Sequence, residues 1–159
     1  MSRVKKIFLA LLLLFIAMQF IRPSLNRTNE QQEADLIKHL HVPADVAGIL
    51  HTSCYDCHSN NTRYPWYTNV QPVGWLLAKH INEGKQDLNF DDFGNYSQRR
   101  RLSKMKATYN SIKDGSMPLS SYTLLHREAK LSKEKEALIL AWADKAIDSL
   151  SGGNKIDND

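Results

Sequence analysis

The two cysteines of this 159-residue chain lie in one five-residue stretch, Cys54-Tyr55-Asp56-Cys57-His58. Two thiols one short turn apart, followed at once by a histidine, have the Cys-x-x-Cys-His spacing of c-type haem attachment. The thiols would bond the two vinyl groups of haem as thioethers, and the His58 imidazole would bind the iron as proximal ligand. We therefore expect one covalent haem c, and this cofactor constrains the fold more than any other feature of the chain.

Three other uses of a Cys-x-x-Cys pair stay open at this point. A thioredoxin-like redox pair normally stands in a βαβ context, which the pattern of this chain does not show. A zinc site would need further ligands at suitable spacing. An exported protein could also close a disulfide between Cys54 and Cys57. The following His58 and the aromatic, proline-punctuated stretch after it favour haem over the disulfide.

The N-terminal segment is an apolar run behind a cationic flank. The range Ile7–Ile21 contains no charged residue, and Arg3, Lys5 and Lys6 precede it, a pattern typical of an export signal. At about 1.5 Å per residue the run makes roughly 22 Å of helix, short of the ~30 Å hydrocarbon core unless flanking residues extend it. No small-x-small cleavage site follows, so residues 1–22 are expected to be an uncleaved transmembrane signal anchor, with a cleaved signal peptide as the alternative.

The net positive charge of the chain comes from the residues that flank this run. The chain has 21 basic and 17 acidic residues, and without the four basic residues that flank the run it has 17 of each. A balanced domain lacks the basic surface that phosphate binding needs, so nucleic acid is not expected as a partner. The stronger positive flank precedes the run, which predicts a single-pass protein of the cytoplasmic membrane with its domain on the periplasmic side. Cleavage would instead give a soluble periplasmic protein.

The remaining chain divides into three parts by composition. Residues 23–32 are predicted to be a polar linker, residues 33–150 a globular domain, and residues 151–159 a polar tail. No part of the domain shows an internal repeat. Its tryptophans are expected to pack in the interior: Trp66, Trp75 and Trp142.

Apolar residues recur at helical spacing in four places of the domain. One helix is expected to lead into the cysteine motif, and a second to run from Val73 to Glu83 with Gly84 as its terminating glycine. Two longer helices are expected after Ser97 and Ser132, whose side chains can cap helix N-termini. No run of alternating apolar residues is long enough for a convincing strand, which makes the expected class all-α.

A six-coordinate iron needs a second axial ligand, for which methionine and histidine are the candidates. Met117 is the best placed, because Gly115-Ser116-Met117-Pro118 is a loop between predicted helices, where the backbone can turn the side chain inward. His80 is the alternative, since it lies at helical spacing from two leucines. Met105 lies on an apolar helical stripe, where methionine is more often core filler than ligand.

Several motifs of the chain also carry a family resemblance: Cys54–Tyr67, Gln71-Pro72, Trp75–His80, Leu88–Phe90, Met117-Pro118, Tyr122, His126, Leu131-Ser132 and Trp142. In these residues the chain resembles the bacterial haem-binding domain family of short exported cytochrome c-like proteins, over roughly residues 33–150. The resemblance implies a small cytochrome c-like helical domain with covalent haem at Cys54 and Cys57 and with His58 as proximal ligand. It also supports Met117 as the distal ligand.

The expected function is that of a membrane-anchored monohaem cytochrome that exchanges single electrons with redox partner proteins. Such a protein is an electron carrier and not an enzyme, because the cofactor performs the redox chemistry. The alternatives are a haem-based sensor or ligand-binding module and a peroxidase-like enzyme, both of which require an open sixth position on the iron. The enzyme would also need nearby acid-base groups such as His80 or Arg63.

Overall fold

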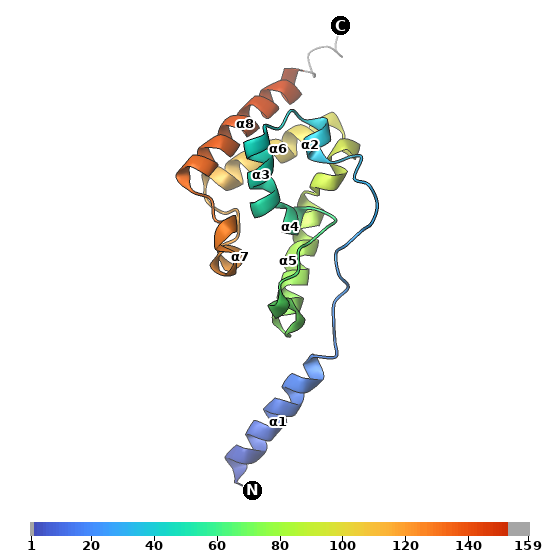
Figure 1. Ribbon diagram of the computed structural model, residues 1–159, viewed down its shortest axis with the longest axis vertical. Coiled ribbons are helices and arrows are strands. Elements are labelled where there is room, and N and C mark those ends of the chain that lie inside the picture. The colour runs from blue at the N-terminus through green and yellow to red at the C-terminus, as the bar shows by residue number, and fades with distance from the viewer. Residues whose placement is uncertain (1, 153–159) are drawn as a thin grey trace.

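The computed structural model describes residues 2–152, and within them the chain forms helices and no strand (Figure 1). This confirms the all-α class. The α-helices of the described residues follow in this order: α1 (Arg3–Met18), α2 (Leu36–His39), α3 (Ala44–Ser53), α4 (Tyr55–His58), α5 (Val73–Asp87), α6 (Gln98–Lys113), α7 (Ser120–Leu125) and α8 (Lys133–Gly152). Three short 3-10 helices lie between them: η1 (Trp66–Asn69), η2 (Phe90–Asn95) and η3 (Arg127–Ala129).

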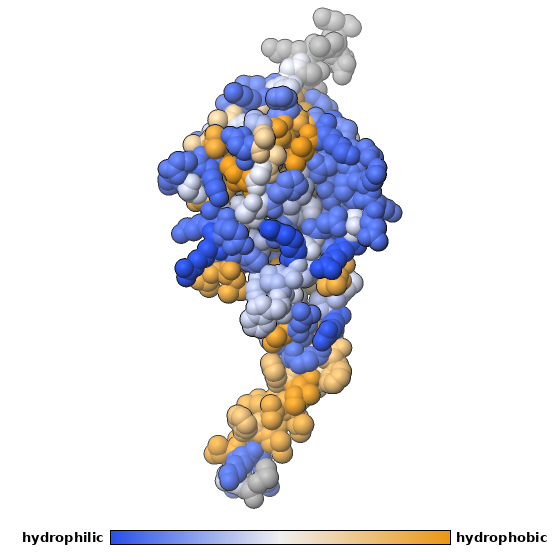
Figure 2. All heavy atoms as spheres, in the orientation of Figure 1, coloured by the Kyte–Doolittle hydropathy of each residue, from blue (hydrophilic) through white to orange (hydrophobic). Residues whose placement is uncertain are grey.

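Helix α1 projects away from the other helices, as an apolar column beneath a mostly polar body (Figures 1 and 2). It has 16 residues, which at about 1.5 Å per residue make roughly 24 Å against a hydrocarbon core of about 30 Å. Among the described residues, no helix combines the length and the apolar character that a membrane crossing requires. The predicted transmembrane signal anchor over residues 1–22 is therefore wrong, and so is the single-pass location with a periplasmic domain that followed from it.

The segment after α1 is held to the domain by hydrogen bonds. Gln19 Nε2 donates to the Gln71 carbonyl at 3.3 Å, and the Gln71 N–H donates back to Gln19 Oε1 at 2.9 Å. Asn26 Nδ2 donates to the Ser59 carbonyl at 2.8 Å, while the Asn26 carbonyl accepts from Thr62 N at 3.0 Å. The predicted linker therefore contacts the loop that follows the cysteine motif.

Helices α6 and α8 form the largest helix pair of the core, and both begin behind the predicted serine caps. Ser97 Oγ accepts from Arg100 N at 3.4 Å, and Ser132 Oγ accepts from Lys135 N at 3.3 Å. Both helices present apolar residues at helical spacing to the interior. The core buries these residues from α3, α6 and α8: Val46, Ile49, Leu50, Met105, Ile112, Ile139, Trp142, Ala143, Ala146 and Leu150.

Helix α5 runs to Asp87, beyond the predicted end at Glu83. Gly84 lies inside the helix, where a Cβ would stand 2.8 Å from the main-chain oxygen of Cys57. Real Cβ atoms essentially never approach a backbone atom so closely. The predicted terminating role of Gly84 is therefore wrong, and glycine is required here because α5 packs directly on the cysteine motif.

The C-terminal third contains two elements that the sequence patterns do not predict. Helices α7 and η3 lie between the Met117 loop and α8, and at 6 and 3 residues they are too short to show a helical period. Helix α8 continues through Gly152. The rest of the predicted polar tail, residues 153–159, lies outside the described residues.

Candidate functional site

One cavity brings the predicted haem ligands together, and we name it the motif cavity. Cys54, Cys57 and His58 line it from the junction of α3 and α4, and Met117 lines it from the loop after α6. His80 reaches the same cavity from α5. Its volume is about 270 Å³, close to the lower end of the range of about 300–1,000 Å³ that is usual for ligand pockets. Both candidates for the sixth iron ligand therefore lie at the space that contains the cysteine motif.

A second, smaller space of about 80 Å³, the inner cavity, adjoins the motif cavity. Its wall is mostly apolar, and it shares Cys54, His58 and Met117 with the motif cavity. Phe90 and Ile112 belong both to this wall and to the hydrophobic core. The two cavities together therefore offer an apolar interior and an open mouth, which suits a flat cofactor with apolar faces.

The imidazole of His58 is fixed by a main-chain carbonyl. His58 Nδ1 lies 2.8 Å from the carbonyl oxygen of Leu88. A carbonyl oxygen can only accept a hydrogen bond, so Nδ1 carries the proton and Nε2 keeps the free lone pair. Metal-binding histidines are commonly oriented in this way through their second nitrogen. The ring is therefore held in the tautomer that a proximal ligand needs.

The two thiols are half-buried, and the pKa of each is raised. Burial raises the pKa of the Cys54 thiol to about 12, with the nearby Cys57 as the smaller cause. Burial also raises the pKa of the Cys57 thiol to about 11, with the charge of Asp56 as the smaller cause. Redox-active Cys-x-x-Cys pairs depend on a lowered thiol pKa. The raised pKa values therefore disfavour the thiol redox alternative.

The disulfide and zinc alternatives also gain no support. Cys54 and Cys57 are both free thiols. Within residues 2–152, no group of three or more His, Cys, Asp or Glu side chains is arranged to hold a bare metal ion. Haem remains the use of the motif that the geometry favours, because its iron takes only axial ligands from the protein.

The Met117 loop is ordered by its own hydrogen bonds. The Met117 N–H donates to the Ser111 carbonyl at 3.1 Å, and Asp114 Oδ1 accepts from Ser116 N at 2.9 Å. Gly115 has a φ of 74°, a left-handed conformation that suits glycine at the end of α6. Met117 itself is 37% exposed. The loop thus directs the methionine to the motif cavity and leaves part of its surface in contact with solvent.

Ser53 holds a polar atom that needs a partner inside the cavities. Its Oγ is buried and makes no hydrogen bond to any described residue, and the residue is 6% exposed. Ser53 lines both the motif cavity and the inner cavity. A buried hydroxyl without a partner costs about 1–3 kcal/mol. We therefore expect the Ser53 hydroxyl to form a hydrogen bond with the molecule that occupies the cavities, or with a water molecule beside it.

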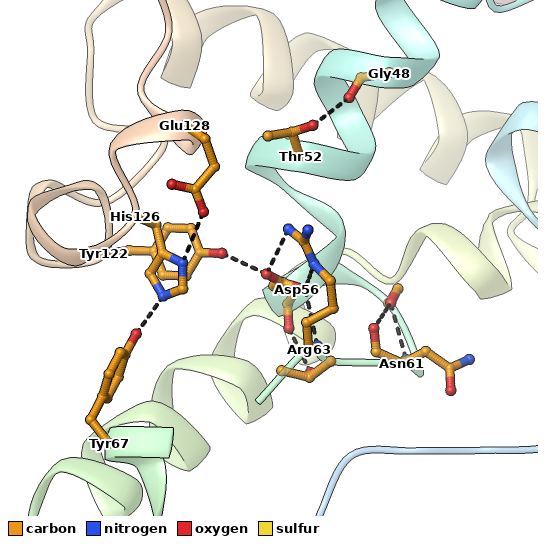
Figure 3. A network of polar contacts seen from close by, with 11 residues as sticks. Gly48, Thr52, Asp56, Asn61, Arg63, Tyr67, Tyr122, His126 and Glu128 are labelled. Carbon is orange, nitrogen blue, oxygen red and sulfur yellow. Dashed lines mark hydrogen bonds and ion pairs between the residues drawn. The ribbon is translucent and has the colours of Figure 1, made fainter. Parts of the chain in front are cut away.

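A polar network that sequence reasoning missed is centred on Asp56, between the two cysteines (Figure 3). The Asp56 carboxylate accepts from Arg63 Nε at 3.2 Å, from Arg63 Nη2 at 3.1 Å and from the Tyr122 hydroxyl at 2.6 Å. Asp56 is 5% exposed, so these donors replace water around its charge. The hydrogen bond to Asp56 raises the pKa of Arg63, and burial followed by the same carboxylate raises the pKa of Tyr122.

His126 extends this network towards η1 (Figure 3). Its Nε2 contacts the Tyr67 hydroxyl, its Nδ1 lies 3.4 Å from Glu128 Oε1, and its ring stacks on Tyr122 with centroids 4.2 Å apart. Burial raises the pKa of Tyr67. Because Tyr122 follows the Met117 loop in the chain, the network ties that loop to the cysteine motif.

Replacing Tyr122 by Phe should lower the free energy of unfolding by about 1.5–3 kcal/mol, because the lost hydroxyl donates to a buried carboxylate. Urea denaturation measures the change. Tyr109→Phe is the matched control: its ring packs against the core, and its loss leaves Asp56 with all its donors. Equal decreases in the free energy of unfolding of the two variants would show that the hydrogen bond to Asp56 does not stabilise the fold.

Comparison with known proteins supports haem binding. A family model described as a haem-binding domain matches residues 13–145, which is most of the chain and includes both cavities and the whole Asp56 network. No curated protein and no solved structure matches the chain. The match covers enough of the chain to establish the family membership that the cysteine motif suggested. The chain belongs to the haem-binding domain family.

Proposed function

We propose that this protein is a c-type cytochrome that binds one haem covalently and passes single electrons. Family membership supports haem binding. The observation that carries the finer proposal is the placement of Cys54, Cys57, His58 and Met117 around one cavity. Two thiols, an imidazole and a thioether are the groups that hold haem and its iron in such a protein.

The residues of the site fit haem in three respects. The wall of the inner cavity is mostly apolar, which suits the faces of the macrocycle. His58 has its Nε2 lone pair free, because Nδ1 is bonded to Leu88. Ser53 Oγ has no partner among the described residues, as expected of a wall whose occupant is polar in part. When bound, haem supplies an iron that alternates between the ferrous and ferric states.

Each side chain has a separate task in this proposal. The Cys54 and Cys57 thiols would hold haem as thioethers through its two vinyl groups, an addition that needs no oxidant or reductant. His58 would bind the iron through Nε2, because Leu88 holds the ring through Nδ1. Met117 would supply a thioether ligand to the iron, and such a ligand raises the reduction potential.

The proposed partners are redox proteins that dock beside the mouth of the motif cavity. Helix α7 exposes Leu124 to 76% and Leu125 to 60%. The same helix contributes Tyr122 to the wall of the motif cavity. Exposed apolar residues beside a cofactor pocket provide a contact patch for another protein.

A haem-based sensor is the second candidate, and one observation favours it. Met117 is 37% exposed, and a partly exposed ligand on a loop can leave the iron to a diatomic gas or a peroxide. A peroxidase-like enzyme gains less support, because Arg63, one of its two candidate acid-base groups, is paired with Asp56. His80, the other group, lines the motif cavity.

Visible spectra of the haem-loaded protein, with and without carbon monoxide, test the proposal. We expect a low-spin c-type spectrum that carbon monoxide leaves unchanged. Met117→Ala should keep the haem and let the ferrous protein bind carbon monoxide, whereas His80→Ala should behave like the natural chain. Opening of the iron by the His80 variant alone would exclude Met117 as ligand. Rapid carbon monoxide binding by the natural chain would favour the sensor.

A further inference from the structure

Lys104 is the one lysine or arginine among the described residues that line the two cavities. It belongs to α6 and faces the inner cavity. Its side chain is 22% exposed, although lysine side chains usually extend into solvent. Its Nζ lies 2.7 Å from Asp87 Oδ1, and Asp87 lines both cavities. A cation therefore stands at the wall of a mostly apolar space.

The cofactor of the proposed function brings negative charge into this space. Haem carries two propionate carboxylates, and a carboxylate in apolar surroundings needs water or a cation as partner. The vinyl groups and the propionates occupy opposite edges of the macrocycle. Cys54 and Cys57 hold the vinyl edge from the α3–α4 junction, so the propionates are expected to reach other elements. Lys104 on α6 and Asp87 on α5 belong to such elements.

The Lys104–Asp87 pair can rearrange without a large loss. Asp87 is 70% exposed in its side chain, so water can solvate the carboxylate once the lysine turns away, and exposed ion pairs contribute little to stability. The Lys104 stem remains packed at the inner cavity, which keeps the ammonium near it. Exchange of one carboxylate partner for another therefore requires only a movement of the end of the lysine side chain.

We propose that Lys104 binds a haem propionate, and that Lys104 and Asp87 shift the reduction potential of the iron in opposite directions. The proposal rests on the covalent haem of the proposed function. A positive charge near the haem favours the ferrous state, which carries one positive charge fewer, and a negative charge favours the ferric state. Lys104 thus raises the potential, and Asp87 lowers it.

Equilibrium redox titration of the haem-loaded full chain tests this inference. Lys104→Gln should lower the potential, and Asp87→Asn should raise it. Lys106→Gln is the matched control, because Lys106 is exposed on the same helix and its loss removes the same charge outside the cavities. The shift caused by Lys104→Gln should be several times larger than that of Lys106→Gln, and it should persist at high ionic strength, where surface charges are screened.

Lys104→Arg keeps the charge and serves as the second variant if Lys104→Gln does not fold. It should retain the potential of the natural chain. Equal small shifts in Lys104→Gln and Lys106→Gln, with normal covalent haem, would overturn the inference and leave the proposed function intact. A shift in Lys104→Arg as large as in Lys104→Gln would also overturn it. Absence of covalent haem from the natural chain would overturn the proposed function and the inference together.

Discussion

Alanine in place of both Cys54 and Cys57 should leave no haem on the chain after denaturation. These are the only cysteines of the sequence, so no other side chain can form a thioether with a vinyl group. Denaturing electrophoresis followed by staining for haem measures the result, with the natural chain matured in parallel. Each single variant should keep one thioether, and its reduced spectrum should move to longer wavelength because one vinyl group stays conjugated.

Thr52→Ala is the matched control for the cysteine variants. Thr52 lies two residues before Cys54 and lines neither cavity, and its replacement leaves both thiols in place, so covalent haem should be retained. A stained band that persists in the double cysteine variant would contradict thioether attachment. Loss of the band in the Thr52 variant as well would indicate that any change close to the motif prevents maturation.

A methyl group at position 84 should lower the free energy of unfolding by about 1–3 kcal/mol, the usual penalty for overpacking. In Gly84→Ala the new Cβ would stand 2.8 Å from the Cys57 main-chain oxygen. The obstacle is backbone, not the end of a flexible side chain, so α5 or the cysteine motif must move. The amount of covalent haem that the variant carries should fall with this displacement.

Gly48→Ala makes the same change at a helical glycine with open space around it. Apart from its chain neighbours and the backbone of its own helix, no atom lies within 4 Å of the new Cβ, so the gain in helix propensity should stabilise the chain by about 0.5–1 kcal/mol. Urea denaturation of both variants beside the natural chain separates the two effects. A loss in both, or in neither, would show that the close contact at Gly84 has no energetic consequence.

The helices of the core could be predicted because their signals are local. Ser97 and Ser132 cap α6 and α8 as expected, and Met105 is completely buried, in agreement with its assignment as core filler. Gly84 was misread because a terminating glycine and a glycine at a close contact look the same in sequence. Trp66 was expected to pack in the interior, but it is 79% exposed. This could not be predicted, because nothing in the neighbouring sequence distinguishes an exposed aromatic residue from a buried one.

The candidate site also combines features that adjacent residues determine with contacts between residues far apart in the sequence. The cysteine motif can be read from five adjacent residues, and the position of Met117 follows from one loop between two helices. The partners of these groups come from elsewhere in the chain: Leu88 bonds His58 from 30 residues away, and Tyr122 bonds Asp56 from 66 residues away. Only the packing of α5 and α7 on the motif makes such contacts possible.

The hydrogen bond from His58 to Leu88 has a consequence for how the site can vary. Its acceptor is a main-chain oxygen, so no side-chain substitution at position 88 can delete it. Any apolar residue that accepts the extended backbone at this position, with φ of −146° and ψ of 119°, should keep the imidazole in place. The orientation of His58 would then be maintained by the course of the main chain, and no particular residue type at position 88 would indicate it in the sequence.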